Sequence, residues 1–266
     1  MQLIQSDSQS QPKSLTLFLK PAFRLIARLS LALALLISPG IATSVFAADA
    51  GYVMPGEMTT ALLPDDIDMD SLARLPQVQR DDLDEYGREV FDLWVRPGTG
   101  YGTGLRGPVG MWMHSPQLAQ GVFPLRQRVR YESDKDQRLT ELAIIATARE
   151  INNQYEYSAH EPLAITAGLE QGIIDLVKFR RPLSEGANLA GFGNEERVII
   201  RFTREVISEE KVSTATFNEA LDIFGREGVM DLVGLIGYYN FVAITLKAFD
   251  VQRPPGTTLL LPVAAP

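Results

Sequence analysis

The sequence predicts an all-α protein, and three observations support this fold class. Apolar residues recur at helical spacing in several segments, and the first of these contains Leu83, Tyr86, Val90 and Trp94. Runs in which apolar and polar residues alternate, which are typical of half-buried strands, are almost absent. An apolar fraction of 45% in a chain of 266 residues favours a folded core over a disordered chain.

We expect the helices to follow one another over most of the chain. Their predicted ranges are 81–95, 115–131, 136–151, 170–179, 195–208, 214–224 and 227–249, and one further helix begins after Asn153 and carries Glu156 and His160. Within that further helix, Pro162 should bend or break the chain, because proline cannot donate to the carbonyl four residues back. Gly168 should cap its C-terminal end.

The start of the predicted helix 115–131 has clear signals. Ser115 is placed to be its N-cap, and Pro116 suits the first helical position. Gly121 and Pro124 should kink the helix. Its apolar stripe consists of Leu118, Val122, Leu125 and Val129.

The N-terminal 47 residues have the features of a secretory signal peptide. Basic residues precede the apolar run from Leu29 to Ile37, a Ser-Pro-Gly sequence ends this run, and small residues near Ala47 offer a cleavage site. A retained membrane anchor is the alternative, although the run is shorter than the roughly 20 residues of a membrane span. We therefore expect a periplasmic or secreted protein with no membrane contact after cleavage near Ala47.

Three segments make up the rest of the chain. Residues 48–80 are rich in Pro, Gly and Asp and should form an N-terminal arm. Residues 81–251 contain the predicted helices and form one helical domain. Residues 252–266 should form an extended C-terminal tail.

Charge and cysteine content exclude several classes of function. A formal net charge of −8 disfavours nucleic acid as a partner, because phosphate binding requires a basic face. The chain has no cysteine, which excludes disulfides, thiol catalysis, cysteine-ligated zinc and iron–sulfur clusters.

The segment Gly102-Thr103-Gly104-Leu105-Arg106-Gly107 matches the pattern of the dinucleotide-binding fingerprint in a formal sense only. The fingerprint requires a strand before it and a helix after it, whereas here a helix precedes and Pro108 follows. We therefore interpret this segment as a loop, which could act as a lid over a pocket.

Two titratable side chains, Glu156 and His160, are spaced one helical turn apart and should project from the same face. Upstream, Glu141 interrupts an apolar run, where a carboxylate is unfavourable unless it has a partner. These three residues could meet and form an acid/base site. The simpler alternative is a surface pair that contributes a few tenths of a kcal/mol to helix stability.

Several short motifs occur in a fixed order along the chain: Leu105-Arg106-Gly107-Pro108, Met113-His114-Ser115-Pro116, Glu141 before Leu142-Ala143-Ile144-Ile145, Tyr155-Glu156-Tyr157, His160-Glu161-Pro162-Leu163-Ala164 and Gly237-Tyr238-Tyr239-Asn240. On these motifs the segment 138–169 resembles the carboxymuconolactone decarboxylase and alkyl-hydroperoxidase-like family, and the resemblance extends over about residues 83–251. The resemblance implies a helical alkyl-hydroperoxidase-like domain. It also implies a homo-oligomer, a trimer or hexamer, and Gly234 and Gly237 are consistent with a close contact across a subunit boundary.

The peroxidase branch of that family carries a Cys-x-x-Cys pair, and the matching positions here are Asn153 and Glu156. Because cysteine is absent, the resemblance implies the decarboxylase branch or one of its relatives. The implied activity is that of a carboxy-lyase, which performs decarboxylation or proton transfer on a small unsaturated lactone or keto acid without a cofactor.

The resemblance also implies roles for individual residues. His160 would donate or shuttle a proton, Glu156 would orient it, and Glu141 would complete the relay. The candidates for substrate binding are Asn153, Tyr157, Arg106 and His114.

The sequence also allows other functions for these residues. The same groups could catalyse isomerisation or lactone hydrolysis. Glu141, Glu156 and His160 could instead ligate zinc or iron, although no metal is our first expectation. A non-catalytic helical oligomer that binds a small acid is the third possibility.

Overall fold

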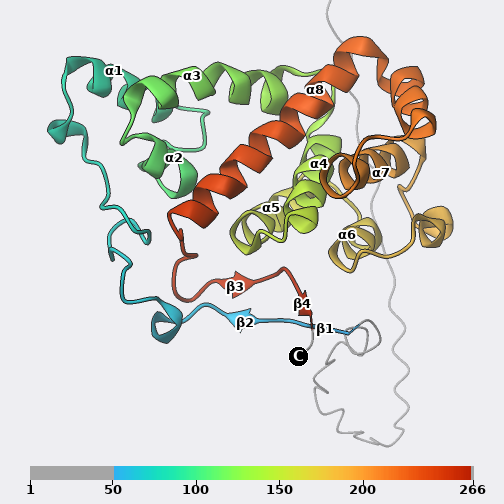
Figure 1. Cartoon of the computed structure of the whole chain (residues 1–266), viewed down its shortest axis with the longest axis horizontal. Helices are drawn as coiled ribbons and strands as arrows, with labels where there is room; N and C mark the ends of the chain where they lie inside the picture. Colours follow the sequence, from blue (N-terminus) through green and yellow to red (C-terminus); the bar gives the residue numbers. More distant parts are fainter. Residues whose placement is uncertain (1–50, 265–266) are drawn as a thin grey trace, which may run out of the picture. The chain divides into compact units, whose positions relative to one another are not determined.

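The computed structural model describes residues 51–264, and their architecture confirms the all-α prediction (Figure 1). The helices are α1 (Glu85–Trp94), α2 (Gly107–Trp112), α3 (Pro116–Gln127), α4 (Gln137–Glu150), α5 (Gln154–Thr166), α6 (Gln171–Lys178), α7 (Asn194–Ser208) and α8 (Thr214–Ala248). The short elements are β1 (Tyr52–Val53), β2 (Gly56–Glu57), the 3₁₀ turns Thr60–Leu62, Arg80–Asp82 and Leu183–Asn188, the π-helical turn η3 (Arg128–Glu132), β3 (Thr258–Leu259) and β4 (Val263–Ala264).

Helix α4 is the centre of the core. Every residue from Leu139 to Arg149 is buried, so this helix is surrounded on all sides. It packs against α5, α7 and α8. Glu141 therefore lies in the protein interior, where its carboxylate needs partners.

Side chains fix the start of each helix that bears on the site. Asp136 accepts a hydrogen bond from the backbone N–H of Leu139 and caps α4. Asn153 accepts one from the N–H of Glu156 and caps α5. Since Glu156 lies in the first turn of α5, this cap also fixes the backbone position from which the Glu156 side chain projects.

The end of α5 differs in one respect from the prediction. The helix continues through Pro162 to Thr166, so the expected break at the proline is wrong. Gly168 does terminate it, with φ at +93°. The N–H of Leu169 donates to the carbonyl of Ala164, as in the Schellman motif.

Three features of the middle of the chain differ from the prediction. The glycine-rich loop leads into the short helix α2, in which all six residues are buried. Helix α3 begins after Ser115 as expected, but the Ser115 side chain forms no capping hydrogen bond. The expected apolar stripe is also only partly correct, because Leu118 and Leu125 are exposed while Arg126 is buried.

The last two predicted helices, 214–224 and 227–249, meet at a kink at Gly225 and together make up α8. This glycine has φ of 65° and ψ of −179°, which is not helical and favours glycine. By length and apolar composition alone α8 could cross a membrane, but 61% of its most apolar window is buried inside the protein, as in a core helix.

The N-terminal arm and the C-terminal tail run together. Strand β1 pairs antiparallel with β4, and β2 pairs antiparallel with β3. Figure 1 shows these short strands beside one another below α5. The predicted signal peptide, with its cleavage site near Ala47, lies outside the described residues.

Candidate active site

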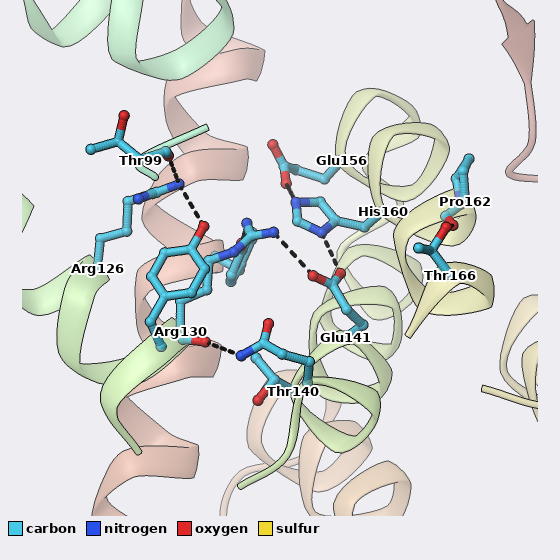
Figure 2. A network of polar contacts seen from close by, with 12 residues as sticks. Thr99, Arg126, Arg130, Thr140, Glu141, Glu156, His160, Pro162 and Thr166 are labelled. Carbon is cyan, nitrogen blue, oxygen red and sulfur yellow. Dashed lines mark hydrogen bonds and ion pairs between the residues drawn. The ribbon is translucent and has the colours of Figure 1, made fainter. Parts of the chain in front are cut away.

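The structure brings His160 between two carboxylates, one from its own helix and one from α4 (Figure 2). Nδ1 of His160 lies 2.7 Å from Oε2 of Glu141. Because a carboxylate can only accept, Nδ1 carries the proton and donates it. All three residues are almost fully buried, with His160 6% exposed and Glu141 4% exposed.

The contact on the other side of the ring is looser. Nε2 of His160 lies 3.3 Å from Oε2 of Glu156, close enough for an ion pair. Within the described chain, however, Oε2 of Glu156 forms no hydrogen bond. A substrate or water with a suitable polar atom could therefore compete for the Nε2 end of the ring, while the Nδ1 end stays held by Glu141.

Arg130 and Tyr239 complete the cluster. Nη2 of Arg130 lies 3.0 Å from Oε1 of Glu141, so both oxygens of this carboxylate have partners. Nη1 of Arg130 donates to the hydroxyl of Tyr239. The Tyr239 ring meets the His160 ring edge to face, with 5.1 Å between centroids. These contacts hold the imidazole plane from the side of α8.

Electrostatics favour a charged pair. Burial alone lowers the pKa of His160, but the hydrogen bond to Glu141 and the nearby carboxylate of Glu156 outweigh burial and raise the pKa above the ordinary value. Burial raises the pKa of Glu141, yet the hydrogen bond to His160 and the charges of His160 and Arg130 bring it below the ordinary value. The imidazolium and the carboxylate therefore stabilise each other.

The charge of Glu156 acts on several nearby phenols, which are buried or partly buried. Burial is the main cause that raises the pKa of Tyr101, Tyr238 and Tyr239, and the charge of Glu156 adds to it. The same two effects raise the pKa of Tyr155 to about 12. These groups stay protonated and remain hydrogen-bond donors at neutral pH.

Two of the residues predicted to bind substrate, Asn153 and Tyr157, have structural roles here. The Asn153 side chain is occupied at the cap of α5, and its Nδ2 lies 3.4 Å from the carbonyl of Ala243. Tyr157 is buried beside Lys178, whose Nζ lies 5.9 Å from the ring centroid. The structure thus places neither side chain among the contacts of His160.

The other two predicted contacts lie outside the cluster. Arg106 is exposed and borders a cleft of about 470 Å³ together with Gly107 and Tyr155. His114 is exposed, and its Nε2 lies 3.0 Å from the carbonyl of Pro76. Of these two, only Arg106 shares a cavity with a residue near Glu156.

Tyr155 lines two clefts near the cluster. This residue borders the cleft that contains Arg106 and also a second cleft of about 640 Å³ next to Asn153 and Asn240. Glu141, Glu156 and His160 line neither cleft. Tyr155, the residue that directly precedes Glu156 in the chain, is thus shared by both clefts.

Sequence reasoning missed Arg130 and gave Tyr239 no role at the site. Tyr239 is in fact in contact with His160. Arg130 was concealed because it lies in the π-helical turn η3, where the spacing of buried positions departs from that of an α-helix. The one available signal was Glu141 itself, because a buried carboxylate that contacts a single histidine still has a second oxygen to satisfy.

A metal-dependent site has little geometric support. Glu141 uses one oxygen for His160 and the other for Arg130, so a metal would have to displace both. Among residues 51–264, no cluster of three or more His, Asp or Glu side chains is arranged to hold a metal ion.

Comparison with known proteins defines the fold. The sequence matches no protein-family model and no curated protein. An uncharacterised peroxidase-related protein from Ralstonia eutropha JMP134, with an alkylhydroperoxidase AhpD core, superposes with a TM-score of 0.53 at 14% identity over 69% of this chain and 93% of its own. A debrominase in complex with 2,3,4-tribromopyrrole gives a TM-score of 0.52 at 16% identity over 66% of this chain and 89% of its own.

The chain therefore has the AhpD-like helical fold, as the resemblance implied. One of these similar structures is a peroxidase-related protein and the other is a debrominase. With no cysteine, the present chain cannot use thiol chemistry.

Proposed function

We propose that this protein is an enzyme that transfers protons to and from a small bound substrate without a cofactor, and that it acts as a carboxy-lyase on an unsaturated lactone or keto acid. The observation that carries this proposal is the buried imidazole of His160 between Glu141 and Glu156. Glu141 holds Nδ1, so the proton available for chemistry is the one on Nε2.

The proposed reaction needs only the groups of this cluster. Loss of carbon dioxide leaves the electron pair of the broken carbon–carbon bond in the conjugated carbonyl of the substrate as a dienolate. The imidazolium of His160 then donates its Nε2 proton to carbon, directly or through Glu156, and becomes neutral. A proton from solvent restores it. General acid catalysis of this kind contributes about 10²–10⁴-fold to the rate.

The polar groups around Glu156 suit such a substrate. Tyr101, Tyr155 and Tyr238 have hydroxyls without hydrogen-bond partners in the described chain, and a lactone carbonyl or carboxylate offers them acceptors. The debrominase of the same fold was solved with a small unsaturated ring, which supports a substrate of this size.

We further propose that substrate enters through the cleft beside Arg106. The exposed guanidinium of Arg106 can attract a carboxylate to this cleft, and Tyr155, which directly precedes Glu156 in the chain, lines the same cleft. The side chain of Tyr155 would move to admit the substrate and would close behind it to exclude water.

The experiment that tests the function is a panel of unsaturated lactones and β-keto acids, assayed for carbon dioxide release and for change in ultraviolet absorbance. We expect turnover of at least one compound, and its loss in His160→Gln. Turnover that persists in His160→Gln, or that requires added metal, would contradict the proposal. Binding without turnover across the whole panel would support a non-catalytic acid-binding protein instead.

We also propose a homo-oligomer formed through one face of α8. Met230, Val233, Gly237 and Ile244 lie at helical spacing, and Met230 and Ile244 are 67% and 63% exposed. A side chain added at Gly237 would meet no atom within 4 Å. Leu125 of α3 is exposed and lies next to Gly234, so it extends this apolar surface. A second copy of the chain is the partner that the resemblance implies.

A further inference from the structure

A separate cavity of about 530 Å³ lies where the end of α4 and the start of α5 meet the paired termini of the chain. No member of the Glu141–His160–Glu156 cluster lines it. Most of its wall is apolar, and the residues that form this wall are Tyr52, Pro55, Leu259, Leu261, Pro262 and Val263.

Specific hydrogen bonds hold the wall of this cavity in place. The backbone N–H of Leu261 donates to Oε1 of Gln154 at 2.8 Å, and the N–H of Leu260 donates to Oγ of Ser158 at 2.9 Å. These two bonds hold the C-terminal segment against α5. Pairing of β1 with β4 then places Tyr52 across from Ala264.

Arg149 brings an unneutralised charge to this cavity. The residue is only 2% exposed, yet no carboxylate within residues 51–264 forms an ion pair with it. Its Nη1 donates to Oδ1 of Asn152 at 2.8 Å, while its Nε is buried without a partner. Its guanidinium carbon lies 5.0 Å from the centroid of the Tyr52 ring. A buried guanidinium without a counter-ion is unfavourable, so a bound anion would stabilise the protein at this position.

Gln154 presents a second unused donor in the same cavity. Its Oε1 accepts from Leu261, which fixes the orientation of the amide. Its Nε2 is consequently a donor, and it is buried without an acceptor. Two residues of the cavity wall, Arg149 and Gln154, thus each have a buried donor without a partner, which indicates a missing acceptor group.

The other arginine in the cavity is already engaged. Arg180 donates through Nη2 to the carbonyls of Arg149 and Glu150, and the same atom lies 3.3 Å from Oε2 of Glu150. This leaves Arg149 as the one uncompensated cation of the cavity wall, so a ligand with a single negative charge suits it better than a phosphate dianion. The planar guanidinium matches a carboxylate.

From this combination we propose a second binding site, for a small monocarboxylate with an apolar body. The carboxylate would accept from Arg149 and Gln154, and the apolar body would lie against Tyr52, Leu259 and Val263. This site is independent of the proposed catalysis, and the ligand it binds need not be a substrate.

Calorimetric titration of the full chain with hexanoate tests the proposal, with hexanamide as the uncharged analogue. We expect hexanoate to bind at one site and hexanamide to bind at least about tenfold more weakly, since a hydrogen bond to a charged group contributes about 1.5–3 kcal/mol. Arg149→Met should weaken hexanoate binding by a similar factor. Equal affinities for the two compounds, no binding of hexanoate, or unchanged binding in Arg149→Met would overturn it.

Matched variants locate the site. Arg204→Met removes a nearby, partly buried arginine that does not line the cavity, and it should leave binding unchanged. His160→Gln should also leave it unchanged, and loss of binding there would show that hexanoate occupies the catalytic cluster instead. If Arg149→Met does not fold, Gln154→Glu gives the same test, because its carboxylate places a negative charge in the cavity and should exclude hexanoate. Full binding in Gln154→Glu would contradict the assignment.

Discussion

Nδ1 of His160 and Oε2 of Glu141 lie 2.7 Å apart although the two residues are 19 positions apart in the chain. The pair joins α5 to the central helix α4 and is buried on both sides. A hydrogen bond between an imidazolium and a carboxylate in such surroundings is short and strong. It fixes the ring and leaves Nε2 facing Glu156, which is the arrangement that a general acid requires.

The first prediction concerns the histidine. His160→Gln should lower turnover by about 10²–10⁴-fold, because glutamine keeps a polar group but cannot transfer a proton. Steady-state kinetics on the substrate found in the lactone panel would measure this. The chain has one other histidine, the exposed His114, so His114→Gln is the matched control and should retain full turnover. An equal loss in both variants would contradict the assignment.

The second prediction tests whether Glu141 affects catalysis through His160 and not merely as a buried carboxylate that stabilises the fold. Glu141→Gln should reduce turnover and move the pH profile, since the group that raises the pKa of His160 is removed. Glu161→Gln is the control, because Glu161 is an equally buried carboxylate but pairs with Lys178. It should lower stability and leave turnover per folded molecule unchanged. A pH profile that is the same in Glu141→Gln and in the wild type would count against the relay.

The third prediction is the pH dependence of stability. The folded-state pKa of His160 is raised, so its contribution to the free energy of unfolding is fully present below the unfolded value of about 6.5. That contribution is lost as pH rises through the folded pKa. For Glu141, whose pKa is lowered, the contribution is present above about 4.3 and is lost as pH falls through the folded pKa. Urea unfolding of the wild type and His160→Gln between pH 5 and 9 should therefore show a difference that shrinks towards high pH, and a difference that grows would be inconsistent with it.

The fourth prediction concerns Tyr155 as the barrier between cleft and cluster. Gly107 has φ of +58°, and a side-chain carbon added there would lie 2.7 Å from the Tyr155 hydroxyl. Gly107→Ala should therefore displace Tyr155, raise KM, and destabilise the protein by about 1–3 kcal/mol through backbone strain. Gly98→Ala has a strained φ of +85°, meets no atom within 4 Å and lines neither cleft, so it should lower stability without changing KM. Equal KM values in the two variants would contradict the proposed role of Tyr155 in substrate entry.

The fifth prediction concerns assembly through α8. Ile244→Glu places a charge on the exposed apolar stripe and should shift the oligomer to monomer in light scattering. Met69→Glu changes a residue of similar exposure, 61% against 63%, that lies outside α8, and it should leave the oligomer intact. A wild-type chain that is already monomeric, or an Ile244→Glu variant that stays assembled, would rule out this interface.

Helical periodicity was enough to predict most of the fold. The ranges of α1, α4, α6 and α7 agree with the structure within a few residues, because their apolar faces match their burial. Helix α2 was missed because a glycine-rich segment gives no periodic signal, although all its residues are buried by neighbours from other helices. The strand pairs were missed for a different reason, since two-residue strands are stabilised by pairing between distant termini.

The site could be predicted in part. The spacing of Glu156 and His160 is local, and the buried position of Glu141 was evident from the apolar run around it. Arg130 and Tyr239 reach the cluster from η3 and α8, and nothing local indicates such contacts. Asn153 is a different case, because it was a candidate for substrate binding and the structure shows its side chain as the cap of α5.

The measurement that tests the central claim most directly is a nuclear magnetic resonance titration of His160 in a His114→Gln background, in which it is the single histidine. We predict a midpoint above the ordinary histidine value of about 6.5, with Nδ1 protonated throughout, and a lower midpoint when Glu141→Gln is added. A midpoint at or below the ordinary value, or one that Glu141→Gln does not change, would contradict the account of His160 as an imidazolium held for proton transfer.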